Sequence, residues 1–294
     1  MAKWTTRDMP PQAGRRVVVT GANSGLGKAA AAELAAAGAD VVLACRDVRK
    51  GKAAAATMTG RVEVRRLDLA DLASVHAFAD DIDALDVLVN NAGVMAVPRG
   101  TTADGFELQF GTNHLGHFAL TGLLLGRIRE RVVTVSSPAH RFGRIDLGDP
   151  NWTQREYRRW PAYAQSKLAN LLFAYELQRR LAASGSAVRS VAAHPGYSRT
   201  EINSNYTRPP LSWLMALGDR IGAAQPARVG ALTTLYAATV DIPGGTYIGP
   251  SWPGEMRGYP RRVGSSRRAR DADVARGLWD LSERLTGVSY LDGR

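Results

Sequence analysis

Arg16 to Gly27 reads RVVVTGANSGLG, and this stretch decides the fold. The β-branched run Arg16 to Thr20 predicts a buried strand, and the glycines that follow permit a tight turn into a helix. Three residues separate Gly21 from Gly25, and one separates Gly25 from Gly27. Such a turn lets the backbone approach a pyrophosphate at a helix N-terminus, where free amides and the helix dipole favour an anion. The stretch therefore predicts a dinucleotide-binding turn.

Short apolar runs alternate with alanine- and leucine-rich stretches along the rest of the chain, which is the rhythm of βαβ units. We expect strands at Arg16 to Thr20, Asp40 to Ala44, Val62 to Leu67, Val87 to Asn90, Val132 to Ser136, Val188 to Ala193 and Thr246 to Ile248. We expect helices at Gly25 to Ala37, Arg49 to Met58, Leu72 to Asp81, Asp104 to Arg127, Pro161 to Ala183 and Pro226 to Thr239. The pattern predicts an α/β fold: a doubly wound parallel (Rossmann) sheet of about seven strands with helices on both faces.

Length and composition favour one domain. Although 294 residues exceed the usual domain size, α/β folds of this length often share one core. We expect a single domain over 1–294, a substrate loop at 195–225 and a basic C-terminal extension at 249–294 that ends in a helix. Asp146 to Trp160 and Asn203 to Gly222 are predicted to be inserted loops near one edge of the sheet.

The net charge of +11 is concentrated late in the chain, where six arginines lie between Arg257 and Arg270. Glycine, proline and serine in that stretch predict an exposed loop. Aromatic residues are sparse there and zinc-finger spacing is absent from the sequence, so nucleic-acid binding is not expected, while contact with an anionic lipid or substrate stays open. The single cysteine, Cys45, excludes an internal disulfide.

No apolar run reaches the roughly 20 residues that span a bilayer. The segment from Met1 to Gly14 is polar and lacks the apolar core of a signal peptide. We therefore expect a cytoplasmic protein without an integral membrane segment.

Tyr163 and Lys167 stand four residues apart in a predicted helix, so they share one helix face. A nearby cation favours the ionised form of a phenol and lowers its pKa. The pair is therefore a candidate acid/base catalyst, and the alternative is an ordinary solvated pair on a helix surface.

The motifs together resemble those of the short-chain dehydrogenase/reductase superfamily. They are TGxxxGxG at Thr20 to Gly27, NNAG at Asn90 to Gly93 and YxxxK at Tyr163 to Lys167, followed by Pro195-Gly196 after a strand. The resemblance runs from about Arg15 to Thr200. Within the superfamily, four stretches are similar to the retinol-dehydrogenase-like branch: LACRD (43–47), NHLGHF (113–118), VSSPAHRFG (135–143) and YAQSKLANLLF (163–173).

The resemblance implies four catalytic residues. Tyr163 is the acid/base, Lys167 lowers its pKa and holds the nicotinamide ribose, and Asn113 supports a proton-relay water. Ser136 and Ser137 are both candidates for the serine that polarises the substrate oxygen, and strand alternation allows only one to face the cleft. The family usually employs the second residue of the pair, so we expect Ser137. His114 and His117 are three residues apart, but they lack an acidic or cysteine ligand nearby, so structural roles and no metal are expected.

The resemblance also implies a nicotinamide cofactor. An acid after the second strand would hold the adenosine ribose, whereas a cation would neutralise a 2′-phosphate. Arg46 stands at that place and favours NADP, while Asp47 leaves NAD as the less favoured alternative. Asp68 and Leu69 match the adenine-contacting position, although Asp68 is alternatively an N-cap before Leu72. The expected cofactor residues are Gly21, Asn23, Ser24, Gly25, Leu26, Gly27, Arg46, Asp68, Leu69, Asn90, Ala92, Gly93, Tyr163, Lys167, Pro195, Gly196 and Thr200.

The expected substrate is a small carbonyl or alcohol compound, with carbonyl reduction the expected direction for an NADP enzyme. Apolar residues after Pro195-Gly196 suggest a lid over a lipophilic pocket, with packing against the sheet or a partner as the equal alternative. They are Tyr197, Tyr206, Trp213, Leu214, Met215 and Leu217. A monomer or homodimer is expected, since Leu168, Leu171, Leu172 and Tyr175 suit either a dimer interface or the core. A non-catalytic NADP(H) sensor or scaffold is the alternative function.

Overall fold

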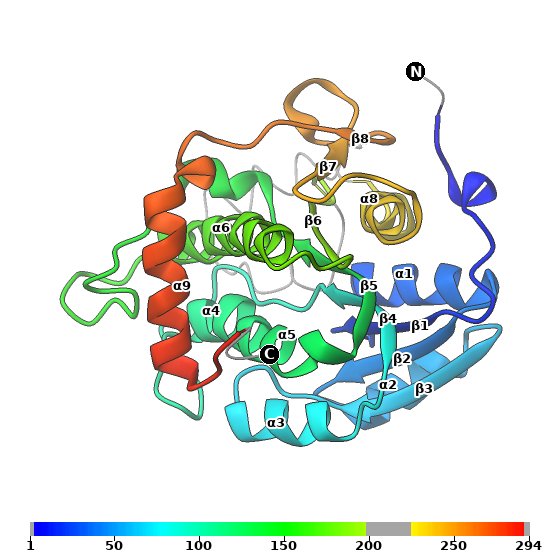
Figure 1. Cartoon of the computed structure of the whole chain (residues 1–294), viewed down its shortest axis with the longest axis horizontal. Helices are drawn as coiled ribbons and strands as arrows, with labels where there is room; N and C mark the ends of the chain where they lie inside the picture. The colour runs from blue at the N-terminus through cyan, green and yellow to red at the C-terminus, as the bar shows by residue number, and fades with distance from the viewer. Residues whose placement is uncertain (1–2, 198–224, 291–294) are drawn as a thin grey trace.

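A computed structural model describes residues 3–197 and 225–290 of the chain, and within them one sheet of eight strands forms the centre (Figure 1). The strand order is β3-β2-β1-β4-β5-β6-β7-β8, and only β8 is antiparallel to its neighbour. The strands are β1 (Arg16–Thr20), β2 (Asp40–Cys45), β3 (Arg61–Arg66), β4 (Leu85–Asn90), β5 (Ile128–Val135), β6 (Arg189–Ala193), β7 (Tyr247–Pro250) and β8 (Pro260–Arg262). The predicted doubly wound parallel sheet is confirmed.

Helices cover both faces of the sheet (Figure 1). The helices α1 (Gly25–Ala36), α2 (Val48–Ala55) and α8 (Ala227–Thr239) follow β1, β2 and β6 and pack on one face. On the other face lie α3 (Leu72–Asp80), α5 (Gly116–Leu124) and α6 (Arg159–Ala183), with α9 (Ala272–Thr286) packed across α6. In β1, Val18 packs on one face, whereas Val17 and Val19 pack on the other. A continuous apolar run is therefore required at β1, because neither face meets water.

The helix predicted from Asp104 to Arg127 is broken. The observed order is α4 (Leu108–Phe110), a π-helical turn (Gly111–Leu115), α5, and a 3₁₀ turn (Leu125–Arg127). Close packing accompanies the break, because a Cβ on Gly111 would overlap the side chain of Thr102 and one on Gly116 would overlap the backbone oxygen of Leu69. The π turn presents Asn113 to the site described below.

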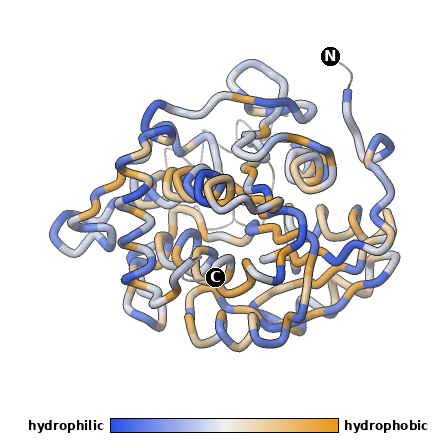
Figure 2. Tube along the Cα trace, viewed as in Figure 1, coloured by the Kyte–Doolittle hydropathy of each residue, from blue (hydrophilic) through white to orange (hydrophobic). Residues whose placement is uncertain are grey.

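The arginine-rich stretch is not entirely a loop, which corrects the prediction. Its residues Pro260–Arg262 form β8, which pairs with β7 at the edge of the sheet, where a proline is tolerated. A 3₁₀ turn at Arg268–Arg270 precedes α9. Figure 2 shows hydrophilic residues along this outer segment and hydrophobic residues along the strands.

The apolar face of α6 belongs to the core of the single chain. Leu168, Leu171 and Leu172 are almost completely buried and cluster with α9 residues such as Leu278. These leucines are therefore core residues and do not form a free dimer surface. The predicted loop at Asp146 to Trp160 contains no strand and becomes helical only at Arg159, whereas all of Asn203 to Gly222 lies outside the described residues.

Candidate functional site

The glycine-rich turn follows β1 and opens α1. Gly21 and Gly25 have φ values of 65° and 55°, in the left-handed region that favours glycine. A Cβ on Gly21 would lie 2.9 Å from Ala92, and a Cβ on Gly27 would lie 2.5 Å from the side-chain nitrogen of Asn91. The turn is therefore packed too closely against the segment after β4 for larger residues.

The N-terminus of α1 suits an anion. Ser24 is the N-cap residue, but its side chain makes no capping hydrogen bond, and the first turn contains no acidic residue. The leading amides and the positive end of the helix dipole are thus not neutralised by the cap. This arrangement fits the pyrophosphate of a dinucleotide.

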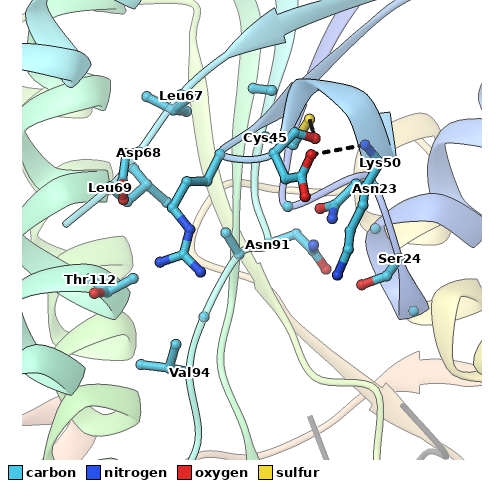
Figure 3. A pocket seen from close by; sticks show the side chains of 18 of the residues that line it. Asn23, Ser24, Cys45, Lys50, Leu67, Asp68, Leu69, Asn91, Val94 and Thr112 are labelled. Carbon is cyan, nitrogen blue, oxygen red and sulfur yellow. Dashed lines mark hydrogen bonds between the residues drawn. The ribbon is translucent and has the colours of Figure 1, made fainter. Parts of the chain in front are cut away.

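A pocket of about 360 Å³ lies beside this turn, at the carboxyl ends of the strands on either side of β1 (Figure 3). The predicted cofactor residues that line it are Gly21, Asn23, Ser24, Gly25, Leu26, Gly27, Arg46, Asp68, Leu69, Ala92 and Gly93. The lining residues outside that prediction are Ala44, Cys45, Asp47, Lys50, Leu67, Asn91, Val94 and Thr112. Most of these are sequence neighbours of a predicted residue. Their position directly after a predicted strand is therefore the feature of the sequence that indicates them.

Asn90 does not line the pocket, which corrects one predicted contact. It is the last residue of β4, it is fully buried, and its amide donates to the Thr121 hydroxyl at 2.9 Å. Asn91 lines the pocket instead, and its amide donates to the backbone oxygen of Thr20 at 2.8 Å. Successive strand residues face opposite sides, so an offset of one residue exchanges the pocket for the core.

The hydroxyl of Thr20 links the end of β1 to the segment after β4 and to His117 on α5, whose ring in turn contacts the π turn. It accepts the backbone N–H groups of Asn91 and Ala92, each at 2.9 Å, and lies 2.9 Å from His117 Nε2. His117 Nδ1 is 3.0 Å from the backbone oxygen of Asn113, which only accepts, so Nδ1 carries the proton and Thr20 donates to Nε2. Burial lowers the pKa of His117 to about 4, in keeping with a neutral ring.

Arg46 follows β2 and lines the pocket as an exposed side chain. No hydrogen bond or ion pair engages its guanidinium within residues 3–197 and 225–290. Asp47, by contrast, is the N-cap of α2 and accepts the Lys50 N–H at 3.0 Å, a bond that lowers the pKa of its carboxyl. Figure 3 shows Lys50 extending toward the end of the pocket where Ser24 lies. The pocket thus offers a free guanidinium beside a carboxylate already used in capping.

Asp68 and Leu69 lie on the opposite wall of the pocket (Figure 3). The Asp68 carboxylate accepts the N–H of Ala70 at 3.0 Å. The N-cap of α3 is Asp71, so the alternative capping role for Asp68 is wrong. Asp68 is held by its own turn and faces the pocket.

Ser137, and not Ser136, is directed toward Tyr163. The hydroxyl of Ser136 is buried and donates to the backbone oxygen of Lys167 at 2.8 Å. Ser137 begins the 3₁₀ helix Pro138–Phe142, and its hydroxyl lies close enough to the Tyr163 phenol to lower the pKa of that phenol. Alternation at the end of β5 separates the two serines, as the sequence predicts.

Lys167 is buried one helical turn beyond Tyr163. Its Nζ donates to the backbone oxygen of Val135 at 3.1 Å and lies 5.8 Å from the centre of the Tyr163 ring. Burial lowers the pKa of Lys167 to about 8 and raises that of Tyr163 to about 12, against the nearby Ser137 hydroxyl, which lowers it. Contrary to the expectation, Lys167 is not among the groups that lower the pKa of Tyr163, and desolvation sets the direction of the shift. Tyr163 holds its proton at neutral pH.

Asn113 connects the segment after β4 to α6. Its amide nitrogen donates to Val94 O and to the Ser166 hydroxyl, both at 2.9 Å, and its oxygen accepts the Val94 N–H at 2.8 Å. Ser166 in turn donates to the backbone oxygen of Tyr163 at 2.8 Å. Both amide hydrogens of Asn113 are thus committed to protein partners, so the side chain fixes the geometry of the tyrosine helix.

A family model described as "short chain dehydrogenase" matches residues 15–210. The chain belongs to the short-chain dehydrogenase/reductase family. It is 43% identical over 298 residues to retinol dehydrogenase 13 of Homo sapiens, with 94% of this chain and 85% of that protein covered. A crystal structure of an uncharacterized protein from Mycobacterium paratuberculosis is 55% identical, with a TM-score of 0.87 over 98% of this chain and 99% of that one.

More distant structures share the fold of this dehydrogenase. A short chain dehydrogenase from Burkholderia cenocepacia in complex with NADP is 24% identical, with a TM-score of 0.64, and the match covers 81% of this chain and 96% of that one. The 3-ketoacyl-(acyl-carrier-protein) reductase from Brucella melitensis, complexed with NADH, is 21% identical with a TM-score of 0.63 over 80% of this chain and 96% of that one. The fold therefore accommodates either cofactor.

As a short-chain dehydrogenase/reductase, the chain is an oxidoreductase that acts on CH–OH or C=O groups with a nicotinamide cofactor. The retinol-dehydrogenase-like branch suggested by the sequence is confirmed. None of the helices in the described residues has the length and apolar character that crossing a membrane requires.

His114 is a structural residue of this dehydrogenase. Its Nε2 lies 2.9 Å from the Ser282 hydroxyl on α9, and burial lowers its pKa to about 3. Together with the contacts of His117, this assigns protein partners to both histidines of the NHLGHF stretch. Groups of three or more His, Cys, Asp or Glu side chains suited to a metal do not occur among the described residues.

The loop after β6 carries Pro195 and Gly196, which do not line the pocket described above. Gly196 has a φ of 67°, and the N–H of Tyr197 donates to the backbone oxygen of Met256 at 2.7 Å. Thr200 lies outside the described residues, as do all the predicted lid residues except Tyr197.

Proposed function

We propose that this dehydrogenase is an NADP(H)-dependent reductase of lipophilic aldehydes or ketones that also catalyses the reverse oxidation of the alcohol. The observation that carries the proposal is the placement of the serines: Ser136 is bonded to the backbone of α6, whereas the Ser137 hydroxyl lies beside the Tyr163 phenol and lowers its pKa. A hydroxyl pair of this kind supplies two donors to one carbonyl oxygen.

Tyr163 is the proposed proton donor. A phenol with a pKa of about 12 is protonated at neutral pH, so it suits the acid role in carbonyl reduction. Ser137 donates a second hydrogen bond to the same oxygen, where negative charge develops. When bound, the reduced nicotinamide supplies the hydride.

Lys167 and Asn113 support the donor. The Lys167 ammonium, with a pKa lowered to about 8, is mostly charged at neutral pH and lies 5.8 Å from the centre of the Tyr163 ring. It is the proposed contact for the nicotinamide ribose. Asn113 keeps α6 in register with the Gly93-Val94 segment of the pocket wall through Ser166 and Val94.

The choice of NADP rests on Arg46. A guanidinium that has no partner among the described residues, at the edge of the pocket, suits a 2′-phosphate, and Lys50 adds positive charge nearby. One oxygen of Asp47 already accepts the Lys50 N–H, which weakens its claim as the ribose-binding acid. Asp68 and Leu69 are the proposed contacts for the adenine ring.

The lipophilic substrate class is supported by the retinol dehydrogenase relatives. Phe142, at the far end of the 3₁₀ helix that Ser137 begins, is 82% exposed. An exposed apolar side chain on the same short helix as Ser137 suits an apolar substrate.

A panel of aldehydes, ketones and their alcohols, followed at the nicotinamide absorbance with NADPH and with NADH, tests the proposal. We expect turnover of apolar carbonyl compounds with NADPH and loss of turnover in Tyr163→Phe. Tight NADPH binding without turnover of any panel compound would instead favour the alternative of a non-catalytic NADP(H) sensor or scaffold.

A further inference from the structure

The turn between β7 and β8 has an unusual backbone. Gly254 and Glu255, in the 3₁₀ turn Pro253–Glu255, have φ values of 72° and 58°. Glutamate rarely adopts this left-handed conformation, which is strained and persists where the surroundings enforce it. The neighbouring Trp252 and Met256 are exposed, whereas the Glu255 side chain is only 15% exposed. The strained backbone thus accompanies a carboxylate directed inward.

The Glu255 carboxylate receives two donors, one on each oxygen. Arg141 Nη2 donates to Oε1 at 2.9 Å, and His194 Nε2 lies 3.1 Å from Oε2. The Gly196 N–H donates to His194 Nδ1 at 3.3 Å, so the ring proton resides on Nε2 and points at the carboxylate. The His194 hydrogen bond and the Arg141 charge hold the pKa of Glu255 below its usual range, so it is a carboxylate at neutral pH.

The two donors belong to different parts of the active site. Arg141 lies in the 3₁₀ helix that Ser137 begins, and His194 directly precedes Pro195-Gly196. Met256, the residue after Glu255, accepts the Tyr197 N–H at 2.7 Å. A Cβ on Gly196 would overlap the backbone oxygen of Met256. The turn from the C-terminal extension therefore contacts both segments closely.

We propose that Glu255 is a positioning residue that fixes the Ser137 helix relative to the loop after β6. The proposal rests on the proposed roles of Ser137 and of the Pro195-Gly196 loop. Through Arg141, Glu255 holds the Ser137 hydroxyl within hydrogen-bond reach of the substrate oxygen. Through His194, it holds the Pro195-Gly196 loop beside the cofactor.

Glu255→Gln tests the proposal with little change of shape. Glutamine has one oxygen for two donors, and its NH₂ group opposes whichever donor it faces, so one of the two hydrogen bonds is lost. With any carbonyl compound that the wild type reduces, we expect kcat to fall about tenfold and the KM for NADPH to rise about tenfold, because small displacements of reacting groups are costly. Asp273→Asn, on the exposed face of α9, is the matched control and should leave both constants unchanged.

The two contacts are separated by single and combined variants. Arg141→Ala should lower kcat with little change in NADPH affinity, and Arg141→Lys should recover part of that loss. His194→Asn should mainly raise the KM for NADPH. In the Glu255→Gln background, Arg141→Ala should add less than it does alone, since both act through one carboxylate.

If the loss of kcat in the double variant equalled the product of the losses in Arg141→Ala and Glu255→Gln, the two residues would act independently, and this result would overturn the proposal. So would a Glu255→Gln enzyme with unchanged kcat and KM, provided that Tyr163→Phe is inactive. If Tyr163→Phe kept wild-type activity, the proposed function itself would fail. Titration with NADPH gives the fraction of folded, cofactor-binding enzyme, by which kcat is corrected. If the loss of kcat disappears after this correction, Glu255 does not act as a positioning residue. If Glu255→Gln does not fold, Glu255→Gly, which tolerates the left-handed backbone, replaces it.

Discussion

The cofactor end and the reaction end of this dehydrogenase are built in different ways. At the cofactor end, the turn from Gly21 to Gly27 is one continuous stretch whose glycines are required by close approach to Ala92 and Asn91. At the reaction end, Ser137, Tyr163 and Asn113 come from separate segments. Ser166 connects Asn113 to the backbone of Tyr163, and Glu255, in the turn between β7 and β8, bonds Arg141 of the Ser137 helix. One end depends on local backbone shape, and the other depends on tertiary contacts.

Removing the phenol should break the reaction end alone. Tyr163→Phe deletes the proposed proton donor, and general acid catalysis contributes about 10²- to 10⁴-fold. We expect kcat to fall by about 10³-fold, while NADPH binding measured by fluorescence titration changes less than about twofold. A comparable loss of NADPH binding would show that the two ends are not separable.

The adjacent serines sharpen the same contrast. Ser137→Ala removes a proposed donor to the substrate oxygen, so kcat should fall by about 10²-fold, as for loss of one oxyanion-hole donor. Ser136→Ala removes only the bond to the Lys167 backbone oxygen and should reduce thermal stability with a much smaller effect on kcat. Steady-state kinetics together with melting curves check both variants, and equal losses of kcat would contradict the assignment.

A charge change should affect the cofactor end alone. Arg46→Ala removes the free guanidinium, and we expect the KM for NADPH to rise about 10- to 100-fold, as for a lost charge-assisted contact. The KM for NADH and the kcat at saturating cofactor should change little. Lys52→Ala, on α2 but not lining the pocket, is the control. A parallel rise in the KM for both cofactors would argue against a 2′-phosphate contact.

Acid should lower the stability of the folded protein through the buried histidines of the reaction end. His114, His117 and His140 lie there, and burial lowers their pKa values to about 3, 4 and 4, below the ordinary 6.5. The unfolded chain therefore binds more protons between pH 6.5 and 4, so stability falls as the pH is lowered through this range, by about 1.4 kcal/mol per pH unit for each extra proton.

Urea unfolding at pH 7.5, 6 and 5 measures this slope. His117→Asn should make the slope shallower, whatever it does to stability at pH 7.5. The exposed His76 on α3 offers the control, because His76→Asn should leave the slope unchanged. A slope insensitive to His117→Asn would mean that other groups govern acid stability.

Local pattern explains which parts could be predicted from sequence. The strand Arg16–Thr20 was predicted to the residue because its apolar run is bounded by charge and glycine. The pocket residues follow strand ends, and the exchange of Asn90 for Asn91 is an error of one position in strand phase. The π turn at Gly111–Leu115 is not predicted, since close packing of Gly111 against Thr102, and of the next residue, Gly116, against Leu69, depends on tertiary structure.

The supporting residues of the reaction end were harder to predict. Glu255 lies in the predicted C-terminal extension (249–294), just before the stretch expected to be an exposed loop, and its contacts with Arg141 and His194 span 114 and 61 residues. The raised pKa of Tyr163 was likewise hidden, because desolvation depends on burial and not on the spacing to Lys167. Long-range contacts and burial are set by tertiary structure, which a local pattern does not contain.

The hydroxyl of Thr20 limits how freely this nucleotide turn can be exchanged between proteins. It holds the backbone of Asn91 and Ala92 and orients His117, whose ring supports the carbonyl of Asn113. A chimera that imports a glycine-rich turn without a hydroxyl at position 20 would inherit the phosphate cradle and lose the link to the proposed catalytic residues. Cofactor engineering in this scaffold is therefore better directed at position 46, which shares no bond with that network.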